Sequence, residues 1–430
     1  MNKINIITLG CSKNTVDSEH LAARARAAGY RIVFDSNSTS AKIVVINTCG
    51  FIADAKQESI DTILEAAEAK KAGRIERLFV FGCLSERYAD ELRQEIPEVD
   101  SFFGARSLDE VLDALGIPEG VCSDTARVLT TPKHYAYLKI AEGCDRRCGY
   151  CAIPLIRGPH RSLPMETIVD EARKLAASGV KELMVIAQDT TYYGVDLYGR
   201  RALADLLRKL CEIEGIEWIR LHYAYPAQFP QDVIEVMRSE PKICKYLDIP
   251  LQHISDSQLR AMKRSIDRKG TEELIERLRE RIPGLAIRTT MLVGYPGETE
   301  EDFAQLQEFV RSARFERLGV FTYSEEEGTY SALKLKDDVP ESVKRQRADS
   351  IMEIQSRISL EYNISCIGSV ERVIIDSETP DGYVARSQYD SPEVDTEISV
   401  TGGRRLRIGS FHNVRITAAD EYDLSAELIE

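Results

Sequence analysis

The feature that most constrains this chain is a CxxxCxxC run placed directly after a predicted strand. Cys144, Cys148 and Cys151 lie within eight residues, and a β-rich segment precedes them over 136–141. Three thiolates on so short a loop can bind a cubane iron–sulfur cluster and leave its fourth iron open for a substrate. Zinc and unliganded buried cysteines are the alternatives. Structural zinc needs four ligands, however, and the nearest histidine, His160, lies nine residues further on.

The region around this loop alternates between strands and helices. Such alternation predicts an α/β fold with a parallel sheet. Six β/α units fit a partial barrel better than a closed eight-stranded one, and catalytic loops of β/α barrels follow the C-terminal ends of strands. The cysteine loop is therefore expected at the active edge. The predicted strands cover residues 136–141, 182–187, 218–223, 246–249, 286–293 and 318–322.

Residues 1–123 are predicted to form a separate N-terminal α/β domain. Short β-rich runs at 4–9, 43–47 and 78–81 are separated by helical stretches. This spacing is typical of a small doubly wound parallel sheet. The polar, sparsely apolar passage over 123–132 then predicts a linker to the central domain.

A second set of three cysteines follows the three N-terminal strands. Cys11, Cys49 and Cys83 each come directly after one strand and next to a glycine. Ligand sites of parallel sheets form outside the carboxyl ends of strands, so we expect these thiols to converge. A single cysteine at such a place is more often a core residue. Three at the same topological position predict a second metal cluster.

The length of 430 residues predicts two or three domains of about 100–200 residues each. The amino terminus lacks the pattern of a secretory signal, and no stretch approaches the roughly 18 apolar residues that span a bilayer. We therefore expect a cytoplasmic protein. In a reducing compartment, the ten cysteines are predicted to bind metal or act in catalysis rather than to form disulfides.

The CxxxCxxC motif, with Tyr150 just before its last cysteine, resembles that of the radical S-adenosylmethionine (SAM) enzymes, whose fold is a partial (βα)6 barrel. The resemblance implies that Cys144, Cys148 and Cys151 ligate a [4Fe-4S] cluster whose open iron binds the amino and carboxylate groups of SAM. In such enzymes, reduction of the cluster releases a 5′-deoxyadenosyl radical from SAM.

The resemblance also implies further contacts to SAM. The segment Thr290–Thr299 ends the fifth predicted strand, which lies beside SAM in this family. Residue types alone predict a Gly-Pro turn there, followed by a helix capped by Thr299 and Asp302. Glu182 and Gln188, on the second predicted strand and in the loop after it, are also expected to face the cofactor, and a solvated loop is the alternative. The candidate cofactor contacts are Tyr150, Glu182, Gln188, Gly294, Pro296 and Gly297.

Over essentially its whole length the chain resembles the methylthiotransferases. Ser12-Lys13-Asn14 after the first cysteine and Gly149-Tyr150 before Cys151 match the branch that methylthiolates an aspartate of small-subunit ribosomal protein S-twelve. Branches that modify tRNA usually carry Gln-Met-Asn and Thr-Phe there. The resemblance implies two [4Fe-4S] clusters, SAM as radical source and methyl donor, and an electron donor such as flavodoxin or ferredoxin. It makes Cys11, Cys49 and Cys83 the ligands of the sulfur-donating cluster.

The carboxyl-terminal segment bears on the substrate. The central domain is expected over 133–365, ending in a long helix over 341–365, and residues 366–430 predict a small all-β barrel of OB size. This barrel resembles a TRAM domain, a module that often grips RNA. It carries thirteen Asp and Glu against six Arg and no Lys, which is half of the net charge of −14.

Binding of RNA needs cations, whereas an acidic surface attracts a basic protein. The charge therefore favours a ribosomal protein over nucleic acid as the substrate, although the carboxylates can also serve solubility alone. A tRNA adenosine methylthiotransferase is the alternative enzyme. An iron–sulfur electron carrier without catalysis is the alternative of another class.

Overall fold

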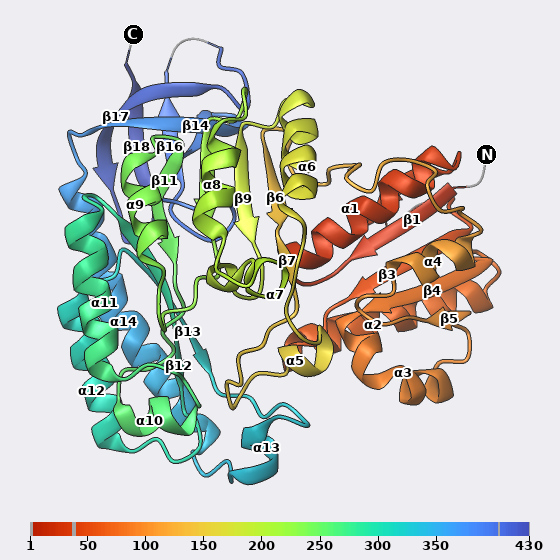
Figure 1. Ribbon diagram of the computed structural model, residues 1–430, viewed down its shortest axis with the longest axis horizontal. Coiled ribbons are helices and arrows are strands. Elements are labelled where there is room, and N and C mark those ends of the chain that lie inside the picture. Colours follow the sequence, from red (N-terminus) through yellow and green to blue (C-terminus); the bar gives the residue numbers. More distant parts are fainter. Residues whose placement is uncertain (1–2, 37–39, 403–404, 430) are drawn as a thin grey trace.

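The computed structural model describes residues 3–36, 40–402 and 405–429, and its N-terminal unit is a five-stranded parallel sheet (Figure 1). The strand order is β2-β1-β3-β4-β5. Apolar side chains of α1 and α4 pack on one face, and those of α2 and α3 pack on the other, so the predicted doubly wound sheet is confirmed. The elements are β1 (Lys3–Thr8), α1 (Ser12–Ala27), β2 (Arg31–Phe34), β3 (Ile43–Thr48), α2 (Ala53–Lys71), β4 (Arg77–Gly82), α3 (Cys83–Glu95), β5 (Ser101–Phe102) and α4 (Leu108–Leu115). The sequence missed β2 and β5, which are short edge strands with little pattern.

The central unit is an open sheet of six parallel strands in the order β13-β12-β11-β10-β9-β6. Among the described residues the two edge strands, β6 and β13, do not pair with each other, so the sheet is a partial barrel as predicted. Its strands are β6 (Tyr135–Lys139), β9 (Glu182–Ile186), β10 (Trp218–Leu221), β11 (Ile243–Asp248), β12 (Ala286–Val293) and β13 (Arg317–Thr322). A large apolar core joins one face of the sheet to the surrounding helices.

The helices and minor strands of the central unit follow the strands in chain order. They are β7 (Ala141–Glu142), α5 (Ile153–Ile156), β8 (Arg161–Ser162), α6 (Met165–Ala177), the 3-10 helix η1 (Thr190–Tyr192), α7 (Val195–Tyr198), α8 (Leu203–Cys211), α9 (Gln231–Ser239), α10 (Asp256–Ala261), α11 (Arg268–Arg281), α12 (Glu300–Ala313), α13 (Tyr330–Lys334) and α14 (Glu341–Ser365). The long helix α14 coincides with the predicted one. No helix in the described ranges is long and apolar enough to cross a membrane.

The C-terminal unit is a closed five-stranded barrel, β14-β15-β16-β18-β17. It packs against the amino-terminal ends of the central strands, at the top of Figure 1. There the rings of Trp218, which begins β10, and Phe411, which begins β17, lie edge to face with centroids 4.8 Å apart. The barrel therefore lies at the end of the sheet opposite the CxxxCxxC loop. Its strands are β14 (Val370–Thr379), β15 (Gly382–Ser387), β16 (Ile398–Thr401), β17 (Phe411–Ala419) and β18 (Leu424–Leu428).

Part of the barrel's negative charge is neutralised at this contact. Asp390 pairs with Arg317 at 2.6 Å, and Asp395 pairs with Arg288 at 3.2 Å. Both carboxylates are almost fully buried against the central unit. They join the two units and do not add to the field that a basic partner meets.

The passage predicted to be a linker is firmly anchored. The Arg127 guanidinium, 2% exposed, pairs with Glu19 of α1 and with Glu171 of α6 at 2.5 Å. The Thr130 amide also donates to Glu19 at 2.6 Å. This segment therefore joins the N-terminal and central units through a buried ion cluster, which its polar composition alone did not reveal.

We expect Arg127→Met to lower the free energy of unfolding by about 3 kcal/mol, because it leaves two buried carboxylates without their cation. Arg93→Met is the matched control. Arg93 pairs with Asp90 on the surface, and exposed pairs contribute about 1 kcal/mol or less. Urea unfolding followed by circular dichroism measures both variants. Equal losses would contradict the anchoring role of Arg127.

Candidate active site

The three N-terminal cysteines lie together at the carboxyl edge of their sheet. Cys11 is the N-cap of α1, Cys49 follows β3, and Cys83 opens α3. Gly10, at φ +90°, lies so close that a Cβ there would stand 2.9 Å from the Cys49 Sγ atom. Burial, together with the charges of Cys11 and Cys49, raises the pKa of the Cys83 thiol to about 11. The structure thus brings together the three thiols that the strand-end pattern singled out.

A buried arginine of the central unit reaches these cysteines. The Arg157 guanidinium, 2% exposed, donates to the Asn14 side-chain oxygen, to Asp17 at 3.0 Å and to Glu142 at 3.2 Å. Burial is the main influence on the pKa of Cys83, and the nearby Arg157 charge opposes it and lowers that pKa. Arg157, which follows the CxxxCxxC loop in the chain, therefore supplies a positive charge that favours the thiolate form of Cys83.

The same network fixes the two units against each other. The Lys139 ammonium pairs with Asp17 of α1 and with Glu142 at 2.8 Å, so α1 lies beside β6 and β7 (Figure 1). Lys139 and Glu142 precede Cys144 by only a few residues, and α1 begins directly after Cys11. The two cysteine triples therefore border one interface.

The CxxxCxxC loop holds its thiols among cations and aromatic rings. The Cys144 Sγ atom accepts from the Arg146 amide at 3.4 Å. The Arg264 guanidinium lies 3.7 Å from the Cys148 Sγ atom. Burial raises the pKa of Cys151 to about 12, and the charge of Cys148 adds to the rise. Such thiols need a metal or another strong cation to be held as thiolates.

Tyr150 and Gln188, two of the candidate cofactor contacts, lie at or near this loop. The Tyr150 ring meets the Tyr295 ring edge to face, with centroids 6.4 Å apart, and its hydroxyl lies 3.5 Å from Arg264. The Gln188 amide donates to Glu142 at 2.8 Å. Tyr150 therefore lies within the cysteine loop, and Gln188 contacts the residue two positions before Cys144.

The Gly-Pro turn after β12 packs against the same loop. Tyr295, within this turn, lies so close to Gly149 that a Cβ on that glycine would stand 2.7 Å from the tyrosine hydroxyl. The Gly294 amide donates to Glu298, and the Gly297 amide donates to Asp338 at 2.8 Å. Pro296 lies between these two anchored amides.

The predicted cap of the following helix is confirmed, because Thr299 and Asp302 form a capping box at the start of α12.

Glu182 lies elsewhere. It is the first residue of β9, so it stands at the amino end of the sheet, away from the cysteine loop. It is fully buried and pairs with Arg220 at 2.8 Å and with Arg386 of the barrel at 2.7 Å. Burial alone would raise the pKa of Glu182, but the two arginines outweigh it and hold that pKa at about 2. The structure gives Glu182 a part in docking the barrel rather than a place beside the candidate cofactor contacts.

The residues at the CxxxCxxC edge fit a cluster with an amino-acid ligand. In the described ranges, no three Cys, His, Asp or Glu side chains are close enough to surround a single ion. A cubane differs because its thiolates bind separate irons. Three buried polar atoms at this edge have no partner among the described residues: Arg146 Nη2, Gln188 Oε1 and Arg264 Nε. Such donors and an acceptor suit the carboxylate and amino groups of SAM.

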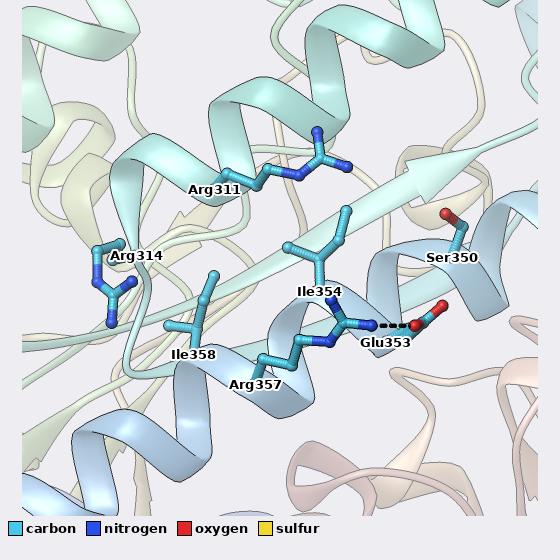
Figure 2. Close-up of a pocket in the computed structure, with 7 residues that line it drawn as sticks. All are labelled: Arg311, Arg314, Ser350, Glu353, Ile354, Arg357 and Ile358. Carbon is cyan, nitrogen blue, oxygen red and sulfur yellow. Dashed lines mark hydrogen bonds and ion pairs between the residues drawn. The ribbon is translucent and has the colours of Figure 1, made fainter.

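A groove on the outer surface is unrelated to this site. Figure 2 shows it between α12 and α14, with Arg311, Arg314 and Arg357 along its sides. Arg314 pairs with Glu361 at 2.5 Å, and Arg357 pairs with Glu353. Its arginines are thus already paired with carboxylates, and none of the cysteines lines it.

Three family models match the chain in order. The model of the family described as "Uncharacterized protein family UPF0004" matches residues 3–104, the radical SAM superfamily matches residues 138–310, and a TRAM domain matches residues 367–429. The last match agrees with the predicted barrel.

Two curated relatives are similar over the full length. A protein of Porphyromonas gingivalis named "Ribosomal protein uS12 methylthiotransferase RimO" is 53% identical over 100% of this chain and 99% of its own. The Bacteroides thetaiotaomicron protein of the same name is 54% identical over 99% and 98% of the two chains.

Solved structures of radical SAM enzymes share the fold. The methyltransferase TsrM from Kitasatospora setae superposes with a TM-score of 0.56 at 14% identity, covering 78% of each chain. The cobalamin-dependent enzyme OxsB gives a TM-score of 0.52 at 12% identity, covering 82% of this chain and 56% of its own.

The fold and the matched families make this chain a radical SAM enzyme, and its full-length relatives make it a methylthiotransferase. It belongs to the RimO family. This membership excludes the non-catalytic electron carrier.

Proposed function

We propose that this chain transfers a methylthio group to the β-carbon of an aspartate in small-subunit ribosomal protein S-twelve. The names of its full-length relatives support this substrate. The observation that carries the proposal is the placement of two cysteine triples on either side of one ion-paired interface. The proposal is that the target is held at this interface, which both triples border.

The proposal assigns one [4Fe-4S] cluster and SAM to Cys144, Cys148 and Cys151. It assigns a second [4Fe-4S] cluster to Cys11, Cys49 and Cys83. When bound, these groups supply the one-electron chemistry, the sulfur and the methyl group. A flavodoxin or ferredoxin is the proposed electron donor.

The protein's own residues contribute placement and shielding. Breaking an unactivated C–H bond is beyond any side-chain base at neutral pH, so the chain must hold the carbon in position rather than deprotonate it. Asp17, Lys139, Glu142 and Arg157 lock α1 onto the carboxyl edge of the central sheet. A rigid, largely buried interface of this kind excludes water from a reactive site.

The substrate class is tested by offering the reduced holoenzyme equal amounts of tRNA and the ribosomal protein. We expect methylthio product on the protein alone, and tandem mass spectrometry would place it on an aspartate. The acidic barrel supports this outcome, because RNA binding needs phosphate-neutralising cations. Product on tRNA alone would replace this proposal with the tRNA adenosine methylthiotransferase.

A further inference from the structure

Lys13 lies in the interface between the N-terminal and central units without an acceptor for its charge. Its side chain belongs to a residue only 7% exposed, and its Nζ atom lies 3.1 Å from the centroid of the Tyr223 ring. In the described parts of the chain, no hydrogen bond or ion pair of this ammonium is found. Lys56 and Lys139 at the same interface each pair with a carboxylate.

The tyrosine under this ammonium is held rigidly at the active edge. Tyr223 follows β10 and has a left-handed backbone at φ +56°. Its amide donates to Asp248 at 3.3 Å, and its carbonyl accepts from the Thr190 amide at 3.1 Å. The ring that supports Lys13 is therefore fixed at the C-terminal end of the central strands.

Both cysteine triples are close along the chain to this pair. Cys11 of the N-terminal triple stands two residues before Lys13. Tyr225, two residues after Tyr223, has its hydroxyl 4.0 Å from the Cys148 Sγ atom. The Lys13–Tyr223 contact thus joins the segment that follows Cys11 to the segment whose Tyr225 contacts Cys148.

An ammonium on a largely buried side chain that meets only an aromatic face is incompletely satisfied. It has three N–H donors, and a cation–π contact does not replace a charged acceptor for them. A carboxylate that enters the interface would form a charge-assisted hydrogen bond. The unmet donors therefore favour an anionic group supplied by the substrate.

We propose that Lys13 binds the side-chain carboxylate of the target aspartate and so positions its β-carbon between the two cysteine triples. This inference rests on the proposed function. It makes Lys13 a specificity-determining residue, because an asparagine in the target position offers only a neutral amide to the ammonium.

The test measures the dissociation constant of the reconstituted holoenzyme for ribosomal protein S-twelve and for its variant with asparagine at the target position. We expect the unmodified enzyme to prefer the aspartate form about tenfold or more. Lys13→Met should bind the two forms equally, and Lys13→Arg should keep the preference. Lys56→Met is the matched control, since Glu326 already meets that charge, and it should keep the preference too.

Three outcomes overturn the inference. One is an unchanged aspartate preference in Lys13→Met. Another is that Lys13→Met binds the aspartate and asparagine forms of the ribosomal protein more weakly by the same factor, which would mean that Lys13 only joins the two units. The third is loss of the aspartate preference in Lys13→Arg, which keeps a cation at this position; this outcome overturns the inference even if Lys13→Met does not fold. Failure of the unmodified enzyme to bind or modify the ribosomal protein would instead refute the proposed function.

Discussion

Replacing Cys148 with alanine should abolish cleavage of SAM. We expect the yield of 5′-deoxyadenosine to fall by about a hundredfold or more, because losing a ligand costs more than the 10- to 100-fold typical of a ligand's supporting contacts. The Cys148 Sγ atom lies 4.0 Å from the Tyr225 hydroxyl and 3.7 Å from the Arg264 guanidinium. Liquid chromatography after reduction with dithionite in the presence of SAM measures the yield.

Cys211→Ala is the matched control for this variant. Cys211 ends α8 and packs against the apolar core of the central unit. Its replacement should leave the yield of 5′-deoxyadenosine within about twofold of the unmodified enzyme, since it removes little buried surface. Normal cleavage by Cys148→Ala would contradict the assignment of the CxxxCxxC loop to the SAM site.

Replacing Cys49 should separate the two halves of the reaction. We expect Cys49→Ala to lose methylthiolated product by about a hundredfold or more while it still releases 5′-deoxyadenosine. Cys49 belongs to the N-terminal sheet and lies beside Gly10 and Cys83, so its loss leaves the CxxxCxxC loop intact. The ratio of product to 5′-deoxyadenosine, measured by mass spectrometry and chromatography, is the diagnostic quantity.

Cys122→Ala provides the comparison for Cys49→Ala. Cys122 is half-buried in the segment between the N-terminal and central units, and it has no place in either triple. That variant should keep the product ratio of the unmodified enzyme. Product formation by Cys49→Ala at the unmodified rate would show that the N-terminal triple does not hold the sulfur donor.

The positions of the two cysteine triples could be predicted from the sequence, because each triple follows the ends of predicted strands. CxxxCxxC is a local spacing. Cys11, Cys49 and Cys83 are far apart in the chain, but parallel strands carry their carboxyl ends to one edge. The same rule also bears on Glu182, since the first residue of a parallel strand stands at the opposite edge.

Residues that join the units could not be predicted from the sequence. Asp17 and Arg157 meet only because α1 docks on the central sheet, and Lys13 meets Tyr223 for the same reason. Such pairs have no periodicity or fixed spacing, so they depend on how two separately folded units pack. The same holds for Arg127, because the polar composition of residues 123–132 does not indicate that it pairs with the buried Glu19 and Glu171.

The net charge of the barrel follows from the sequence, but the sequence does not show which of its carboxylates are paired with buried cations. Net charge bears on long-range attraction only where carboxylates are free of cations. Asp390 and Asp395 are buried against Arg317 and Arg288, so they hold the barrel on the central unit. The proposed preference for a basic partner therefore rests on the remaining exposed carboxylates.

The most direct test of the central claim is the iron content of the anaerobically reconstituted protein, with Mössbauer spectra to identify the clusters. Two separate triples predict about eight irons per chain as two [4Fe-4S] clusters. Each of Cys49→Ala and Cys148→Ala should lower this to about four, with the other cluster's spectrum unchanged. About four irons in the unmodified protein, or loss of both clusters from either single variant, would contradict two independent sites.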